Sequence, residues 1–458
     1  VVGSVSCVEE TGYMPPVGGF LYWLRPGTTK LPLFRSAPLI GGYRRTWFDV
    51  IAYAVFLGGC GWALVSPEIT SEQLLVLALV VPLLGVLDKT LFLAARAEHY
   101  WVTALVFLWA GSNGVVDSVT LVAGAKAVML ALWFFAGFSK LNHHFPATVC
   151  VMTSNSPLTR GTPLRRWVYR HYPDDLRPSG FAVLLAHAGT LLELSIPLVL
   201  AFATGPWLTV GVALALLLHL HITSSVPMAA PLEWNVLMVY GVFALFVAHP
   251  EIQVFDLGLS GLSVFLLCAL VALPLLGNLF PNRVSFLLAM RYYAGNWPYG
   301  VWLFRGESYR KLDRLKKSAA WVHDQLARFY DHATAVGLVG KVLAFRLMHL
   351  QGRCLPNLIP KAVDRLQDFE YVDGEIIAGL ALGWNFGDGH LHNEQLLAAI
   401  QAQCRFEPGE LRCIFVEAQP LFGKTLEYRI VDAATGLIEK GTCDVAELRT
   451  RQPWEQSA

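Results

Sequence analysis

The sequence predicts a polytopic α-helical membrane protein with about eight transmembrane helices, followed by a small C-terminal α+β domain. Composition is the first observation behind this prediction: of 458 residues, 55% are hydrophobic and only 15% are charged, whereas soluble proteins carry about 25% charged residues. The second is the uneven placement of charge, since 30 of residues 1–304 are charged, against 39 of residues 305–458. Together they exclude a disordered protein, a coiled coil and an ordinary soluble enzyme.

The third observation is a series of long apolar segments in the charge-poor part of the chain. A helix needs about 20 apolar residues to cross the hydrocarbon core of a bilayer. The candidate segments are Trp47–Ser66, Gln73–Leu87, Tyr100–Gly111, Ser118–Leu141, Phe181–Thr204, Trp207–Thr223, Leu232–Ala248 and Leu257–Phe280. The second and third are short, so the count of eight carries an error of one or two.

The charges between these segments predict an orientation. Five basic residues lie between residues 25 and 45, five arginines lie between Lys140 and Gly180, and three arginines lie between residues 283 and 305. Basic and non-basic connections alternate along the chain. By the positive-inside rule, both ends of the chain and the Lys140–Gly180 loop are expected in the cytoplasm.

These patterns divide the chain into three parts. Residues 1–46 form a cytoplasmic or interfacial segment, which begins with Val rather than Met, so a longer native N-terminus is expected. Residues 47–304 form the transmembrane domain, and residues 305–458 form a cytoplasmic α+β domain. In this last part the periodicity predicts helices at Ser308–Thr334 and Gly337–Leu350, and strands at Cys413–Ala418, Glu427–Val431 and Leu437–Gly441.

Several partners are excluded. The formal net charge is +1 and no stripe of Lys and Arg alternates with aromatic residues, which excludes a nucleic-acid partner. The eight cysteines form no Cys-x-x-Cys pair, so neither a disulfide scaffold nor a structural zinc site is expected. The expected partners are the lipid bilayer, a lipophilic small molecule and a protein that docks on the cytoplasmic domain.

Ionisable side chains at membrane depth are costly, so each is a functional candidate. The candidates are Asp88, Lys89, His99, Lys126, Lys140, His187, Glu193, His219 and His221. Lys140 ends a very apolar run, where burial would lower the pKa of its ammonium and produce a base. The alternative is a lysine that extends to the membrane surface.

Glu193 is expected to meet a histidine of the next helix, either His219 or His221. These two histidines are two residues apart and so point in different directions on a helix. A metal site would need a third ligand, so no metal is expected, and the alternative is a hydrogen-bonded network that fixes helix packing. In the charge-rich part, the segment Gly383–His392 combines three glycines with Asp388, His390 and His392, which is typical of either a functional loop or a tight turn.

Four short motifs carry a resemblance to a known family. They are Leu87-Asp-Lys-Thr90 followed by His99, Ala136-Gly-Phe-Ser-Lys140-Leu, Leu191-Leu-Glu-Leu-Ser195 and Leu218-His-Leu-His221. Over about residues 75–245 the chain resembles the transmembrane domain of vitamin K-dependent gamma-glutamyl carboxylase and its bacterial relatives, the horizontally transferred transmembrane (HTTM) proteins. Through Pro26–Pro32 and the Lys140–Gly180 loop, the whole chain resembles more closely an uncharacterised bacterial family of transmembrane proteins, a domain of unknown function.

The resemblance implies roles for individual residues. Lys140 matches the lysine that deprotonates the vitamin K hydroquinone, His99 matches a histidine that protonates the carbanion, and His219 matches a Phe-His run with Leu218 in place of Phe. The distance from Asp88 to His99 is about four residues longer than in the family pattern. Because no large extracytoplasmic domain is expected to bind a protein substrate, gamma-carboxylation of a peptide is not expected. The implied location is the bacterial cytoplasmic membrane.

Three hypotheses follow. In the first, the protein is a membrane enzyme whose substrate or cofactor is a quinone or another lipid, with Lys140 as base, His99 as proton donor or acceptor, and Glu193 and His219 as orienting groups. In the second, the same polar groups line a pathway for lipid handling or transport without catalysis. In the third, the protein is a scaffold subunit whose cytoplasmic domain docks a partner.

Overall fold

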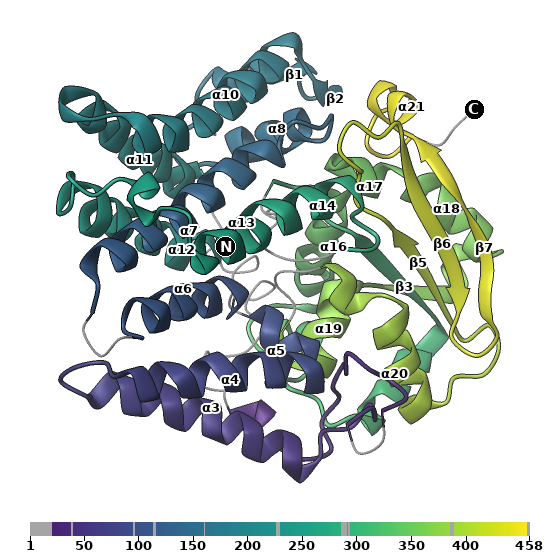
Figure 1. Cartoon of the computed structure of the whole chain (residues 1–458). Helices are drawn as coiled ribbons and strands as arrows, with labels where there is room; N and C mark the ends of the chain where they lie inside the picture. Colours follow the sequence, from purple (N-terminus) through teal and green to yellow (C-terminus); the bar gives the residue numbers. More distant parts are fainter. Residues whose placement is uncertain are drawn as a thin grey trace.

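The structure is a computed structural model, in which a bundle of apolar helices lies on one side of a sheet-containing C-terminal region (Figure 1). It describes residues 21–37, 40–94, 97–112, 116–159, 161–225, 230–284, 291, 294–384 and 389–455.

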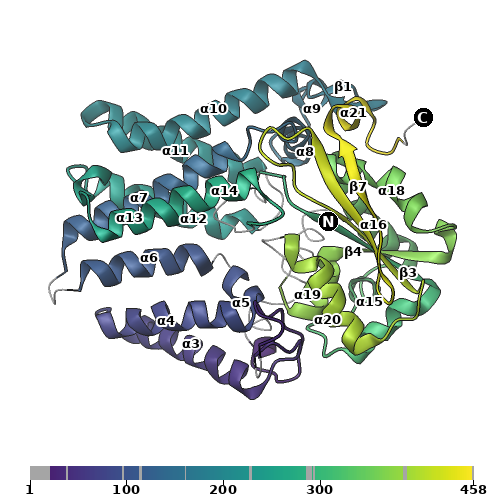
Figure 2. The same cartoon turned by 45° about the vertical axis from the view of Figure 1, so that its right-hand side comes forward.

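The bundle is made of helices that lie side by side, away from the sheet (Figure 2). Its helices are α3 (Trp47–Val65), α4 (Ser71–Leu87), α6 (Ala97–Ala110), α7 (Ser118–Phe138), α10 (Gly180–Phe202), α11 (Gly205–Ser225), α12 (Ala230–Gly241), α13 (Gly261–Leu267) and α14 (Leu273–Leu279). The π-helical segments Val242–Val247 and Cys268–Ala272 extend α12 and join α13 to α14. The shorter helices α5 (Lys89–Leu93), α8 (Phe145–Asn155) and α9 (Leu164–Trp167) lie between the long ones along the chain.

Five helices of the described residues are long and apolar enough to cross a membrane. They are Trp47–Val65, Ser118–Phe138, Gly180–Phe202, Gly205–Ser224 and Gly261–Leu279. The apolar helices Ser71–Leu87 and Asn235–Val247 are shorter, and α6 has only 14 residues, which spans about 21 Å at 1.5 Å per residue. A membrane protein with several helices is therefore confirmed, whereas the expected count of eight spans is not.

Helix α7 occupies the centre of the bundle. In its most apolar stretch 61% of the residues are buried, against 28–39% in the other four long helices. Those outer helices instead expose large apolar side chains such as Trp62, Leu198 and Val264, as expected where the surroundings are lipid rather than water. The central helix α7 therefore ends at one end of the bundle, and the residues that follow it begin there.

The C-terminal region is built on one antiparallel sheet with the strand order β4-β3-β5-β6-β7. The strands are β3 (Tyr299–Arg305), β4 (Phe369–Asp373), β5 (Leu411–Val416), β6 (Thr425–Asp432) and β7 (Gly436–Asp444). The last three lie close to the predicted strands. The first two were not predicted: β3 is buried on both faces, so it lacks the alternating pattern that identifies a half-exposed strand.

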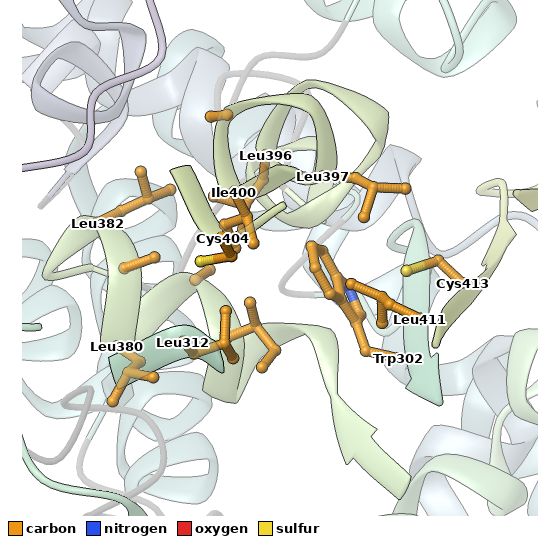
Figure 3. Close-up of a cluster of buried hydrophobic side chains, with 14 of the residues drawn as sticks. Trp302, Leu312, Leu380, Leu382, Leu396, Leu397, Ile400, Cys404, Leu411 and Cys413 are labelled. Carbon is orange, nitrogen blue, oxygen red and sulfur yellow. The ribbon is translucent and has the colours of Figure 1, made fainter. Parts of the chain in front are cut away.

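Helices cover both faces of this sheet. One face carries α19 (Gly374–Leu382) and α20 (Glu394–Cys404), which pack on Trp302 and Phe304. Figure 3 shows Trp302 of this cluster together with side chains of both helices. The other face, with Val301 and Leu303, carries three short helices of the same region. They are α17 (Leu350–Arg353), α18 (Leu355–Ala362) and α21 (Val445–Thr450), while α15 (Val322–Leu326) and α16 (His332–Met348) precede them in the chain. Alternate residues of β3 therefore serve two separate cores.

The segment before α3 joins the bundle to the C-terminal region. The Tyr22 hydroxyl donates to the carbonyl of Ala381 (2.8 Å), and the Trp23 indole donates to the carbonyl of Leu382 (2.8 Å). Two fully buried ion pairs hold the same segment to the bundle: Lys30 with Asp49 at 2.6 Å, and Arg45 with Asp88. Asp88 is therefore part of the packing of the N-terminal segment.

Replacing Asp88 by asparagine is expected to lower the free energy of unfolding by about 3–5 kcal/mol, because the buried Arg45 guanidinium would lose its counter-ion. Chemical unfolding of the purified protein in detergent measures the difference. The matched control is Asp117→Asn at the exposed N-cap of α7, where asparagine is an equally good cap and the change should stay below about 0.5 kcal/mol. Equal effects of the two substitutions would contradict the prediction.

Candidate functional site

The centre of the candidate site is a buried ion pair between α7 and α10. The Lys140 ammonium donates to the Glu193 carboxylate, and the two side chains are only 12% and 6% exposed. The ammonium also lies 5.3 Å from the centre of the Phe145 ring. Lys140 is thus enclosed by a carboxylate and an aromatic face rather than extended toward solvent.

Small residues and a helix end bring this pair together. A Cβ atom on Gly137 would lie 3.0 Å from Leu194 Cγ, so glycine allows α7 and α10 to approach closely beside Glu193. The backbone then turns, because Ser139 caps α7 and the Lys140 N–H donates to the carbonyl of Gly137 at 3.0 Å. Lys140 is therefore the second residue beyond the end of α7.

His219 of α11 is held in one tautomer beside this pair. The Trp133 indole N–H donates to His219 Nε2 at 2.7 Å, and an indole nitrogen is only a donor. The ring proton therefore sits on Nδ1, which donates to Asn235 Oδ1 at 2.6 Å. The charges of Glu193 and Lys140 lie within electrostatic reach of this imidazole, so His219 lies near the pair but is held by Trp133 and Asn235.

The other histidine of α11 points elsewhere. His221 is exposed, as the two-residue offset from His219 on a helix requires. His187 is exposed as well. Of the two partners considered for Glu193, only His219 faces the interior.

His99, the fourth predicted residue, is not brought to the pair. It is buried near the start of α6, where its carbonyl accepts from the Thr103 hydroxyl at 2.9 Å. Among the described residues, the contacts of Lys140 are to Glu193 and Phe145. Lys126 also lies apart, since its ammonium caps the carbonyls of His249 (2.8 Å) and Ile252 (2.5 Å).

The C-terminal region holds the turn that carries Lys140. Two residues further on, the Asn142 amide donates to the carbonyl of Gln419 (3.2 Å) and accepts from the Phe422 N–H (2.8 Å). Asn296 donates to the same Gln419 carbonyl at 2.8 Å and accepts from Gln351 at 2.8 Å. The position of the lysine thus depends on contacts with the loop between β5 and β6.

Sequence reasoning missed a second buried polar group, at the end of the edge strand β4. Arg346 bridges Asp373 (3.1 Å) and Glu375 (2.5 Å), and the Tyr299 hydroxyl donates to Asp373 at 3.0 Å. The only signal was Asp373-Gly-Glu375 before an apolar helix, which is typical of an ordinary helix start. The pairing with Arg346, 27 residues earlier, has no local signature.

The predicted Gly383–His392 segment contributes a paired histidine. His390 Nε2 lies 3.0 and 3.1 Å from the two carboxylate oxygens of Glu417, at the end of β5. Asp388 lies outside the described residues. Among the described residues, no three His, Cys, Asp or Glu side chains are grouped to hold a metal ion.

Comparison with known families decides the class of this protein. A family model described as a transmembrane protein of unknown function (DUF3556) matches residues 2–458. The chain belongs to this family. Comparison with curated proteins and with solved structures gave no match. Family membership and the five long apolar helices agree on an integral membrane protein.

Proposed function

We propose that the chain is a membrane enzyme that moves a proton to or from a lipophilic substrate, a quinol or another lipid, at Lys140 and Glu193. The observation that carries this proposal is the ion pair inside the bundle, at the end of its central helix. Ionisable groups at such a depth are costly and are kept mainly for function. The HTTM-like motifs around both residues support the same assignment.

The pair offers a route to a lysine base. Low solvation disfavours both charges, so transfer of the Lys140 proton to Glu193 produces a neutral amine beside a carboxylic acid. The amine then accepts a proton from the substrate, and the resulting substrate anion lies beside the new ammonium. His219 carries its proton on the side of Asn235, so it orients rather than supplies a proton in this arrangement. The role of His99 stays a prediction from the resemblance.

The topology belongs to the proposal as well. The basic loops support a cytoplasmic location for both ends, for the Lys140 turn and for the C-terminal domain of residues 305–458 in a bacterial cytoplasmic membrane. The substrate then enters from the bilayer, and its reacting group reaches Lys140 at the cytoplasmic end of the bundle.

The test is a search for a chemical change in lipids. The purified protein in nanodiscs is incubated with a bacterial lipid extract and with a reduced quinone, and the products are followed by mass spectrometry. A product formed by the wild type should fall at least about 100-fold in Lys140→Ala and Glu193→Gln, the range expected for loss of an acid–base group.

Two controls separate the hypotheses. His221→Ala, on the same helix as His219 but exposed, should retain full activity, whereas His219→Ala should lose most of it. Protein that binds or moves lipid without any change in lipid mass would contradict the enzyme and favour the lipid-handling alternative. Equal turnover in wild type and Lys140→Ala would contradict the assignment of the site.

A further inference from the structure

Three basic side chains are buried near the place where α8 packs against α16 of the C-terminal region. His144 is the N-cap of α8, His349 lies between α16 and α17, and Arg353 ends α17. Their exposed fractions are 0%, 3% and 2%. The Arg353 N–H donates to the His349 carbonyl at 3.1 Å, and His349 lies within electrostatic reach of both His144 and Arg353.

These side chains carry polar atoms with no hydrogen-bond partner among the described residues. They are both ring nitrogens of His144, both ring nitrogens of His349, and Nε and Nη2 of Arg353. The His144 ring lies beside the backbone of Ala294 without a well-formed hydrogen bond to it. Buried polar groups are nearly always paired, so six such atoms at one contact call for an occupant.

Arg353 presents the geometry of an oxyanion site. Its Nη1 donates to the carbonyls of Leu448 and Arg451, both at 3.2 Å. The two nitrogens left over, Nε and Nη2, lie on one edge of the planar guanidinium group. That edge is the fork which binds two oxygens of a phosphate or carboxylate.

The surrounding charges leave a positive excess at this contact. Lys140 is paired with Glu193, Arg346 with Asp373 and Glu375, and Arg177 with Asp175. No carboxylate of the described residues lies within ion-pair distance of His144, His349 or Arg353, although Asp175 is near enough to Arg353 to act on its charge. The N-terminus of the 11-residue helix α8 adds a partial positive charge at His144.

We propose that His144, His349 and Arg353 bind a phosphate group, carried by a lipid or free in solution. A phosphate has enough oxygens to bind the guanidinium fork and one nitrogen of each imidazole ring together. His144 is four residues beyond Lys140, whose charge acts on it, so a phosphate bound here lies next to the proposed catalytic pair. The assignment of a phosphate-bearing lipid as the substrate class rests on the proposed function. Phosphate binding by itself requires no reaction.

Binding at this site is coupled to protons. Burial lowers the pKa of His144 and of His349 to about 3, so both rings are neutral without an anion. A phosphate favours the imidazolium form, and proton uptake then accompanies binding. The groups that face the two rings are Lys140, His143, Arg346 and Arg353, and their charges or protonation oppose this uptake unless the anion is present. The affinity should therefore rise as the pH falls from 8 to 6.

Calorimetric titration of the full chain in detergent tests the site with three probes: inorganic phosphate, dihexanoyl phosphatidic acid and dihexanoyl glycerol, which has no phosphate. The wild type should bind a phosphate-bearing probe and not dihexanoyl glycerol. Arg353→Lys keeps the charge but loses the fork, and His349→Asn removes one imidazole; each should weaken binding at least about tenfold. His349→Asn should also flatten the pH dependence.

The same two substitutions at exposed side chains serve as controls. They are Arg310→Lys and His171→Asn, whose side chains are 60% and 78% exposed, and both variants should bind the phosphate-bearing probes as the wild type does.

Tighter binding of phosphatidic acid than of inorganic phosphate identifies a lipid headgroup as the ligand, and equal binding identifies free phosphate as sufficient. No binding of either probe, or equal binding in Arg353→Lys, His349→Asn and the controls, would overturn the site and leave buried water as the occupant. Phosphate binding is measured without any turnover, so a failure of the proposed catalysis leaves the test of this site unaffected.

Discussion

Replacing Glu193 by alanine is expected to lower the free energy of unfolding by about 3–5 kcal/mol, because the Lys140 ammonium would remain in the bundle without its counter-ion. The penalty comes from an unpaired charge with little access to water, not from the loss of an attractive contact alone. Unfolding of the detergent-solubilised protein by denaturant measures it. Glu251→Ala, at a side chain that is 65% exposed, should change the stability by less than about 1 kcal/mol.

The double variant Lys140→Met/Glu193→Leu distinguishes a structural pair from a functional one. Apolar side chains of similar volume often replace a buried ion pair with no loss of stability, so this variant should be at least as stable as the wild type. If it folds and lacks the activity sought above, the pair is kept for chemistry rather than for the fold. A Glu193→Ala variant as stable as the Glu251→Ala control would contradict the burial of the pair.

Lowering the pH from 6.5 to 5 is expected to remove about 3 kcal/mol from the stability through His144 and His349. Burial lowers the pKa of each to about 3 in the folded protein, whereas an exposed histidine titrates near 6.5. Between these values the unfolded chain binds more protons, so stability falls as the pH falls, by up to about 1.4 kcal/mol per pH unit for each histidine.

Unfolding measured at several pH values in a buffer without phosphate checks this slope. His349→Asn should remove about half of it, because one of the two titrating groups is gone. His171→Asn, at an exposed side chain, should leave the slope unchanged. The same slope in His349→Asn as in the wild type would show that this histidine is not buried in its neutral form. Added phosphate should reduce the loss of stability in the wild type if the anion site is occupied as proposed.

The elements with a strong local pattern could be predicted from the sequence. The apolar runs of α3, α7, α10 and α11 are long and uninterrupted, and their bounds differ from the predicted ones by only a few residues. The number of spans could not be predicted with the same accuracy, because short apolar helices such as α4 and α6 have the composition of a span without its length. Strand β3 could not be predicted for a related reason: a strand that is buried on both faces is as apolar as a membrane helix.

The residue types of the candidate site could be predicted, but not their partners. The high cost of charge among apolar residues singles out Lys140 and Glu193 in the sequence. That the two are paired follows only from the close approach of α7 and α10 at Gly137, over a separation of 53 residues. The same reasoning fails for Asp88, which looks like a membrane carboxylate in the sequence and forms a buried ion pair with Arg45.

By itself, then, the sequence determined that this is a membrane protein with a charge-rich C-terminal region and a handful of ionisable residues in apolar surroundings. These properties depend on composition and on local periodicity, and both can be determined from a single segment of about 20 residues. Only the tertiary structure decided that Lys140 meets Glu193, that His219 faces inward while His221 does not, and that His144, His349 and Arg353 are all buried. Contacts between residues that are distant in the sequence depend on how the helices pack against one another. Side-chain packing of this kind produces no periodic pattern along the chain.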